Sequence, residues 1–322
     1  MSQRALGMVL GVVFDAVLAD PRQWHPVAGF GATATALERI TYRDTRRAGV
    51  LHVAVLVGGA AVLGRWQRAE LLLSTAAATW VVLGGTSLLR EGSAMAAELE
   101  TADLGAARER LPSLCGRDPA GLDLAGLARA TVESVAENTS DAVVAPLLWG
   151  AVAGVPGLLG YRAANTLDAM IGHHSARYEQ FGWAAARLDD VLNLVPARVT
   201  GWLTACCAPM VGGSPHAALV AWGRDAGAHP SPNAGVVEAT MAGALGVQLG
   251  GATVYAYGAQ QRPTMGRGVP PDAADLRRAV RLSRAVQLST AVVSGALAVA
   301  VDQHWHRLRL GFRLRDWFCN RG

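Results

Sequence analysis

Three carboxylates lie at helical spacing in the segment ESVAENTSD, which covers residues 133–141. Residues four positions apart on a helix face the same side, so Glu133, Glu137 and Asp141 would form one acidic stripe. Like charges at this spacing repel each other, and a bound cation would relieve the repulsion. Oxygen ligands suit Mg²⁺, and Asn138 and Ser140 add polar groups nearby. The stripe is therefore a candidate Mg²⁺ site, although a helix face in water would show the same spacing.

A second set of polar residues recurs every three positions in YRAANTLD, where Arg162, Asn165 and Asp168 stand. An arginine binds phosphate or carboxylate groups through paired hydrogen bonds, and the amide and carboxylate can orient it. Arg177 follows as another cation. We expect a phosphate-binding or catalytic group here. An interfacial helix with its polar face in water is the alternative.

A third set lies in ARLDDVLNLVPAR, where Asp189, Asp190 and Asn193 fall within about one helical turn. Polar groups this close to apolar runs are candidates for functional sites. Arg187 can serve as a phosphate-binding cation, or it can simply pair with Asp190 along the helix.

Two shorter motifs complete the set of candidate binding residues. In SPNAG, Ser231 or Asn233 could cap the following helix, whose first N–H groups would then be open to an anion. Near the start, Asp20 and His25 belong to the polar segment DPRQWHPVAGFG and could reach one cavity. Close helix packing and a proline-directed turn are the simpler explanations of these motifs.

The composition indicates what kind of scaffold must hold these residues. The chain is 51% hydrophobic and 17% charged, against roughly 25% charged residues in soluble proteins. Apolar runs alternate with charged segments, which predicts an all-α, polytopic integral membrane protein with polar helical segments between its membrane runs. The lipid bilayer is thus an expected partner.

The basic residues narrow the possible chemistry. All 29 of them are arginine, which excludes a P-loop lysine on a nucleotide and a Schiff-base lysine. Because they are scattered between apolar segments, we do not expect a nucleic-acid partner.

Several runs can be assigned along a single domain spanning 1–322. Residues 50–64 and 71–89 predict a helical hairpin, and 90–141 a soluble helical segment. Residues 302–322 mix tryptophan and phenylalanine with arginine, which predicts an amphipathic tail. No β-strand pattern stands out.

The run 142–160 is apolar but contains Pro146, Pro156 and several glycines. These residues allow a membrane helix to break and bend back where other protein surrounds it. We therefore predict that this run does not cross the membrane as one straight helix.

Taken in order, the segments resemble the CobD/CbiB family. The similarity covers DPRQWHPVAGFG, ESVAENTSDAVVAPL, YRAANTLDAMIG, RYEQFGWAAARLDDVLNLVPAR and SPNAGVVEATMAGALG, from about residue 15 to 270. It implies a multi-pass protein of the cytoplasmic (inner) membrane in cobalamin biosynthesis. The implied enzyme is a ligase that forms an amide bond between adenosylcobyric acid and (R)-1-amino-2-propanol phosphate, or a related amino alcohol phosphate.

The same resemblance implies ATP and Mg²⁺ as cofactors and leaves association with other cobalamin-assembly membrane proteins open. On this reading the acidic stripe holds Mg²⁺, the arginines named above hold phosphates, and Asp168, Asp189 or Asp190 accepts the amine proton. Two other classes remain. A transporter would explain charges among broken apolar helices but predicts two similar halves, which are not evident. A Mg²⁺-dependent prenyltransferase-type enzyme would need two aspartate-rich motifs.

Overall fold

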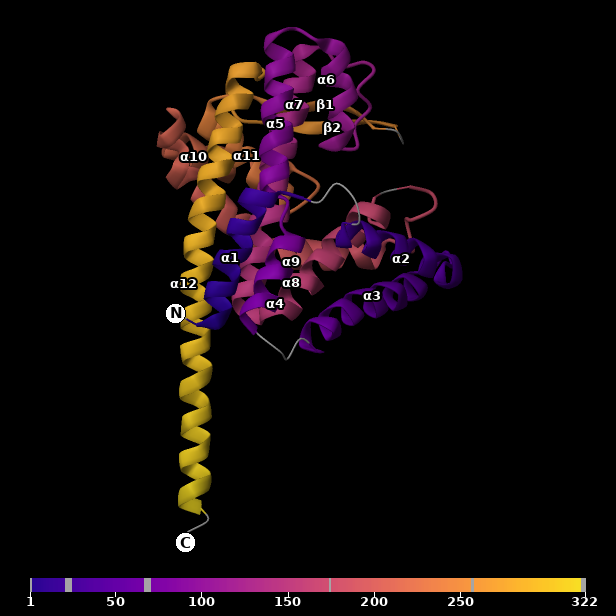
Figure 1. The fold of residues 1–322 in the computed structure, drawn as a ribbon. Helices are drawn as coiled ribbons and strands as arrows, with labels where there is room; N and C mark the ends of the chain where they lie inside the picture. The colour runs from indigo at the N-terminus through magenta and orange to yellow at the C-terminus, as the bar shows by residue number, and fades with distance from the viewer. Residues whose placement is uncertain (1, 21–24, 67–70, 174, 256–257, 320–322) are drawn as a thin grey trace.

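The computed structural model describes residues 2–20, 25–66, 71–173, 175–255 and 258–319. The described chain folds into helices joined by short turns, with one β-hairpin near the C-terminal end (Figure 1). Its elements are α1 (Gln3–Leu18), α2 (Pro26–Thr41), α3 (Arg46–Trp66), α4 (Leu71–Val82), α5 (Gly85–Glu100), α6 (Leu104–Arg110), η1 (Leu111–Ser113), α7 (Leu124–Thr139), η2 (Ser140–Val144), α8 (Ala145–Ile171), α9 (Trp183–Cys207), η3 (Ala208–Val211), α10 (Pro215–Asp225), η4 (Ala226–Ala228), α11 (Ala234–Leu245), β1 (Leu249–Tyr255), β2 (Gly258–Met265) and α12 (Ala273–Cys319).

The expected all-α membrane fold is confirmed. Within the described residues, five helical stretches are long and apolar enough to cross a bilayer: Arg46–Trp66, Leu71–Glu100, Leu124–Ile171, Trp183–Val211 and Ala273–Arg307. Large apolar side chains on these helices remain exposed, as a lipid-facing surface requires.

The predicted hairpin of 50–64 with 71–89 is wrong. Helix α3 packs mainly on α8, whereas α4 packs mainly on α1. The reason is the placement of small residues: a Cβ on Gly7 or Gly11 of α1 would lie within 2.8 Å of Thr75 or Thr79 of α4. Glycine therefore lets these two backbones approach closely, which apolar patterning alone does not indicate.

Helix α8 reverses direction in its middle. Gly154 has φ 67° and ψ −150°, outside the helical region, and Pro156 follows it. A Cβ on Gly157 would meet the carbonyl oxygen of Trp149 at 2.2 Å, although eight residues separate the two positions. The two limbs therefore lie side by side, which confirms that 142–160 is not one straight helix.

Arg4 of α1 stabilises this reversal. Its guanidinium donates to the carbonyl oxygens of Ala151 and Val152 at 3.1 and 3.4 Å. It also contacts Asp302 of α12 at 2.9 Å. Carbonyl groups at a helix end lack partners within the helix, so Arg4 caps the first limb of α8 and ties it to α1 and α12.

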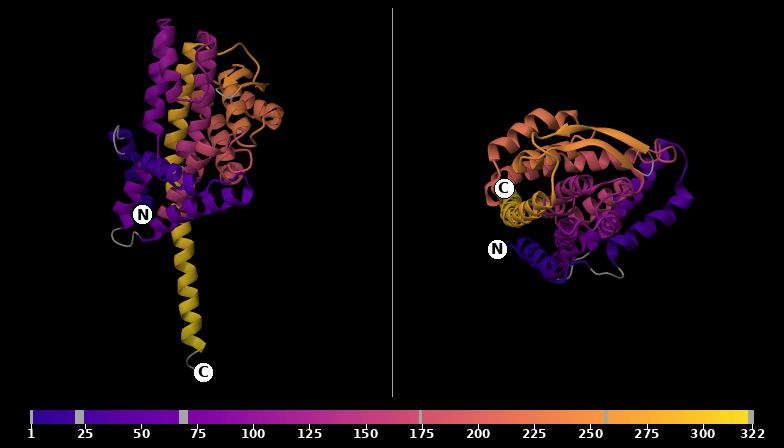
Figure 2. Two further views of the ribbon diagram at one scale, coloured as in Figure 1. Left: turned by 90° about the vertical axis from the view of Figure 1, so that its right-hand side faces the viewer. Right: turned by 90° about the horizontal axis from the view of Figure 1, so that it is seen from above.

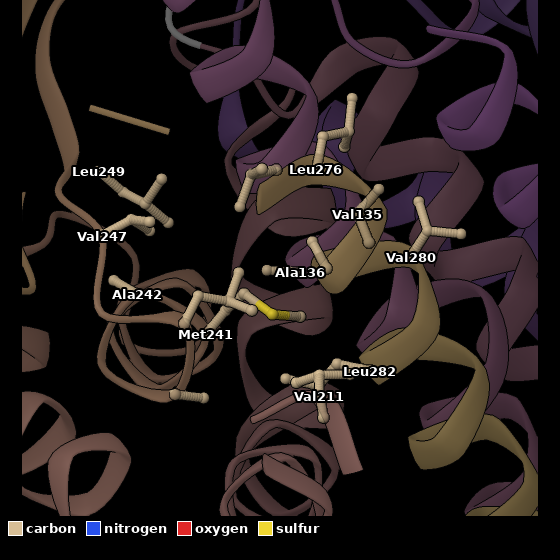
Figure 3. Packing of buried hydrophobic residues seen from close by; sticks show 14 of the residues in the cluster. Val135, Ala136, Val211, Met241, Ala242, Val247, Leu249, Leu276, Val280 and Leu282 are labelled. Carbon is tan, nitrogen blue, oxygen red and sulfur yellow. The ribbon is translucent and has the colours of Figure 1, made fainter. Parts of the chain in front are cut away.

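The largest hydrophobic core among the described residues lies between α5, α7, α11 and α12, with η3 beside them. Figure 3 shows Met241 of α11 extending towards α7 and α12, near Ala136 and Leu282. Polar contacts cross this core as well, such as the one between the hydroxyl groups of Thr139 and Ser283 at 2.5 Å. This core packs around the C-terminal end of α7. The acidic motif of residues 133–141 continues from that end into η2.

Strands β1 and β2 form an antiparallel hairpin in a region where the sequence shows no strand pattern. The register shifts between Leu249 and Gly251, and both Gly250 and Gly251 have positive φ. A bulge breaks the two-residue alternation by which a strand is recognised. The sequence pattern therefore does not indicate this hairpin, although its backbone pairs regularly beyond the bulge.

Helix α12 runs past α5, α7, α8 and α1, and its C-terminal part extends beyond the other helices (Figures 1 and 2). The helix continues unbroken across residue 302, where the amphipathic tail was expected to begin. The segment 90–141 contains the end of α5, then α6, η1 and α7, and it leads directly through η2 into α8.

Candidate functional site

A polar cavity of about 300 Å³ opens where α7, η2, α8, α9 and the start of α11 meet. Carboxylates contribute half of its polar lining residues, and histidine, serine and asparagine contribute the other half. The polar lining residues are Glu137, Ser140, Asp141, Asp168, Asp189, Asp190, Asn193, His229, Ser231 and Asn233. Residues from the first three sequence motifs, which lie on α7 to α9, therefore line one cavity. The SPNAG motif contributes to the same lining.

The reversal of α8 brings the first two motifs together. Asn165, on the second limb, donates weakly to Asp141 Oδ2 at 3.4 Å and to Asp189 Oδ1 at 3.3 Å. A straight helix would hold Asp141 and Asn165 about 36 Å apart, at 1.5 Å per residue. Asp141 itself lies in a π-helical turn, a conformation that is frequent at functional sites.

The carboxylates of α9 and α8 differ in their hydrogen bonding. Asn193 donates to Asp189 Oδ2 at 2.9 Å and accepts from the Tyr161 hydroxyl at 2.8 Å. Both oxygens of Asp189 are thus engaged. The side chain of Asp168 forms no hydrogen bond or ion pair within the described part of the chain. Its carboxylate is therefore open to the cavity.

The segment SPNAG forms the opposite wall. The amide of Asn233 donates to the Asp190 carbonyl at 2.7 Å, and its oxygen accepts from Arg198 at 2.7 Å. Ser231 Oγ accepts from the N–H groups of Asn233 and Ala234 at 3.3 and 3.1 Å. Ser231 is therefore the capping side chain. The first N–H groups of α11 have local partners, so the expected open anion site at this helix start is not formed.

Glu133 is separated from the other acidic residues of its motif. It is 1% exposed, contacts Arg117, and accepts from Arg262 Nη1 at 3.2 Å and from the Gly250 N–H at 2.7 Å. Its carboxylate is therefore occupied by two guanidinium groups and the backbone, an arrangement that does not favour the expected metal role. Glu137 does line the cavity, with Arg262 at 3.8 Å.

The sequence motifs did not reveal the centre of this ion network, Arg262 of β2. Its guanidinium donates to Glu238 at 2.7 Å and also contacts Glu133 and His229. Its partners lie far away along the chain, so no local pattern could indicate it. Glu238 did carry a signal, because it is the one charged residue in the apolar helix α11.

The environment controls the charge of two residues beside the cavity. Burial, followed by the charge of Arg262, lowers the pKa of His229 below its ordinary value, so the imidazole is neutral near pH 7. Because a guanidinium only donates, Nε2 accepts from Arg262, and Nδ1 faces the backbone of Ser231, whose N–H and carbonyl groups lie at 3.0 and 3.1 Å. Burial also raises the pKa of Glu238, and the carboxylates of Glu137 and Glu133 raise it further.

A different cavity contains Arg162. This cavity measures about 180 Å³ and includes Asp20 and Asn138. Arg162 Nε is buried without a hydrogen-bond partner in the described structure. His25 lies nearby, with Nε2 at 3.4 Å from Asp20, and its Nδ1 caps α2 by accepting from Val27. Arg162 and the pair Asp189 and Asp190 therefore line different cavities in the described structure, whereas Asp168 lines the cavity of that pair and Asn165 donates to Asp189.

Two predicted phosphate-binding arginines lie away from the cavity. Arg177 pairs with Glu38 of α2 at 2.9 Å and stacks over the Tyr42 ring at 4.2 Å. Arg187 is 67% exposed and lies 3.8 Å from Asp190. The simple helix pair that competed with a functional role is thus the contact observed for Arg187.

The cavity has donors suited to a hard cation without forming a complete protein cage. Among the described residues, no group of three or more His, Cys, Asp or Glu side chains is arranged to hold a metal ion. Mg²⁺ commonly uses one or two carboxylates together with water and substrate phosphates. Glu137 and Asp141 fit that smaller requirement because both line the cavity.

Comparison with known proteins identifies the family of this chain. A family model described as CobD/Cbib protein matches residues 8–283. The cobalamin biosynthesis protein CobD of Mycobacterium tuberculosis strain H37Rv is 58% identical over 296 residues, covering 90% of this chain and 95% of that protein. The protein of the same name from Rhodobacter capsulatus is 41% identical, covering 91% and 96%.

A third relative, cobalamin biosynthesis protein CobD of Chromobacterium violaceum, is 41% identical over 314 residues and covers 91% of this chain and 98% of its own. No solved structure matches the chain significantly. The matched region contains every lining residue of the cavity. This chain is a multi-pass membrane protein with a role in cobalamin biosynthesis, and it belongs to the CobD/CbiB family.

Proposed function

We propose that this protein joins adenosylcobyric acid to (R)-1-amino-2-propanol phosphate, or a related amino alcohol phosphate, in an ATP-dependent reaction. The bond formed is an amide between a propionate carboxyl group and the primary amine, and the product is adenosylcobinamide phosphate. Family membership supports this reaction. The observation that carries it is the cavity itself, in which five carboxylates meet at the end of a membrane-embedded hairpin.

The charge of this cavity explains why a divalent cation would be required. Glu137, Asp141, Asp168, Asp189 and Asp190 line it, and no arginine from the described residues does so. Such a surface repels both ATP and a propionate. When bound by Glu137 and Asp141, Mg²⁺ would supply positive charge for phosphate oxygens during activation of the carboxyl group.

The amine of the second substrate is protonated in water and must lose a proton before it attacks. Asp168 is the preferred proton acceptor because its carboxylate faces the cavity without a partner among the described residues. Asp189 is held by two asparagines and would position the cavity wall. We therefore assign proton transfer to Asp168 and an orienting role to Asp189.

The cavity with Arg162 offers a separate place for an anionic group. Asn138 and Ala142 line that cavity, while Ser140 and Asp141 line the larger one, so only the π-helical turn separates the two. A phosphate in this cavity would accept hydrogen bonds from the buried guanidinium of Arg162. Asp20 lines the same cavity but leaves Arg162 Nε without a hydrogen-bond partner in the described structure. The corrin ring is much wider than either cavity, so only its propionate arm would enter.

The test uses protein purified in detergent with adenosylcobyric acid, ATP, Mg²⁺ and aminopropanol phosphate. Product is detected by mass spectrometry, and the nucleotide product is identified separately. We expect ADP and inorganic phosphate, because the terminal phosphate of ATP passes to the propionate carboxyl group and leaves it when the amine attacks. Detection of AMP in place of ADP by chromatography would contradict the acyl phosphate route. Absence of the amide product would contradict the proposed reaction.

Substitutions then test the assignments. Asp168→Asn should lower kcat by about 10²- to 10⁴-fold, the usual contribution of a general base. Glu137→Ala and Asp141→Ala should abolish product formation while the protein still inserts and purifies. Glu109→Gln, an exposed carboxylate on α6, is the matched control and should retain activity. Full activity of Asp168→Asn would remove Asp168 from the mechanism.

A further inference from the structure

An amphipathic groove of about 500 Å³ lies between α1, α5 and α12, apart from both cavities described above. Its walls combine aliphatic and polar side chains. The lining consists of Val12, Asp15, Ala16, Leu83, Thr86, Leu89, Arg90, Ser93, Val143, Arg284, Gln287 and Leu288. A groove of this composition suits a ligand that has both a polar and an apolar part.

The buried polar group in this groove is Asp15 of α1. The residue is 6% exposed, and its Oδ2 accepts from the Thr86 N–H at 3.0 Å and the Thr86 hydroxyl at 2.9 Å. Its Oδ1 is buried without a hydrogen-bond partner in the described structure. Leaving a buried acceptor unsatisfied is costly, so a ligand with an N–H donor would stabilise this oxygen.

Two arginines supply positive charge to the same groove. Arg90 and Arg284 form no hydrogen bond or ion pair with described residues. Arg284 is also the last charged residue of α12 before the uncharged stretch 285–301. Leu288, one turn further into that stretch, is 58% exposed. The charged end of the groove therefore lies at the boundary between the polar and apolar parts of the molecule.

We propose that this groove binds a glycerophospholipid whose headgroup carries a primary amine, as in phosphatidylethanolamine. Arg90 and Arg284 bind the lipid phosphate, and Asp15 accepts a hydrogen bond from the ammonium group. Val12, Leu83 and Leu288 contact the acyl chains. The lipid thereby joins α1, α5 and α12.

The headgroup is specified by the pairing of opposite charges. Phosphatidylglycerol would engage the arginines but would bring no ammonium group to Asp15. Phosphatidylcholine carries a positive charge, but its quaternary nitrogen has no N–H to donate. A primary ammonium next to a phosphate satisfies both ends of the site.

The experiment is native mass spectrometry of the detergent-purified full chain, titrated with dioleoyl-phosphatidylethanolamine, dioleoyl-phosphatidylglycerol or dioleoyl-phosphatidylcholine. We expect the wild type to bind the ethanolamine lipid about tenfold more tightly than the choline lipid, as one charge-assisted hydrogen bond would provide. Asp15→Asn should abolish that preference. Arg284→Gln should weaken binding of both phosphatidylethanolamine and phosphatidylglycerol, and Arg281→Gln, an exposed neighbour on α12, should change neither.

Because Asp15 is buried, its variant could fail to fold. In that case the lipid proposal is tested with Arg284→Gln and with Arg90→Gln, which changes an exposed residue. Equal affinity of the wild type for ethanolamine and choline lipids would overturn the proposal. Unchanged lipid binding in both arginine variants would do the same. Displacement of the lipid by soluble O-phosphoethanolamine at equal concentration would assign the groove to a soluble amine phosphate and would also refute the lipid proposal.

Discussion

Replacement of Gly154 by alanine should destabilise the protein through the backbone alone. Gly154 has φ 67° and ψ −150°, a region that residues with a Cβ rarely occupy. An added Cβ would find Arg4 Nε at 3.8 Å and Pro156 Cδ at 3.9 Å, which are ordinary contacts. The cost is therefore torsional, about 1–3 kcal/mol, rather than steric.

A loss of this size should lower the ratio of folded to unfolded protein by about 5- to 150-fold. Gly58→Ala on α3 is the matched control, because this helical glycine has nothing within 4 Å of an added Cβ. That substitution should stabilise the helix by up to about 1 kcal/mol. The same chemical change should thus have opposite effects at the two positions.

The assay is unfolding in mixed micelles with increasing sodium dodecyl sulfate, followed by the fluorescence of the nine tryptophans. Gly154→Ala should shift the midpoint to lower denaturant and reduce amide formation, because the reversal places Asn165 beside Asp141. A midpoint equal to that of the wild type, or shifted in the same direction as Gly58→Ala, would refute a reversal that depends on this glycine conformation.

Other substitutions test the buried contacts and the topology. Glu133→Gln should cost about 3–5 kcal/mol, because it removes one partner of a buried ion network, and its unfolding midpoint should fall well below that of Glu109→Gln. Arg4→Gln should lower the midpoint by removing the cap on α8, and no change would contradict that role. Ser175→Cys, on a background without other cysteines, should resist an impermeant thiol reagent in intact cells. Labelling there would place the connection between α8 and α9 outside the cell, on the opposite side of the membrane from the cytoplasmic ATP that the proposed reaction consumes.

The residues of the cavity were largely predictable because helical spacing is a local property. Intervals of three and four residues placed Glu137 with Asp141, and Asp189 with Asn193, on shared faces before any tertiary contact was known. The same rule misplaced Glu133, which shares the stripe but turns to Arg117 and Arg262. Helical periodicity predicts on which face of a helix a side chain lies. Its contacts depend on which other segments of the chain pack against that face.

The amino-acid sequence alone predicts the apolar runs, the helical class, the chain reversal near Pro156 and the family. These follow from composition and local order. Three features emerge only in the folded chain: α3 packs on α8, Arg162 faces a separate cavity, and Arg262 completes the ion network. Such choices depend on close backbone approach at glycines and on charges that lie up to 129 residues apart along the chain. They are long-range properties, because the energy of each contact exists only after the whole fold brings its partners together.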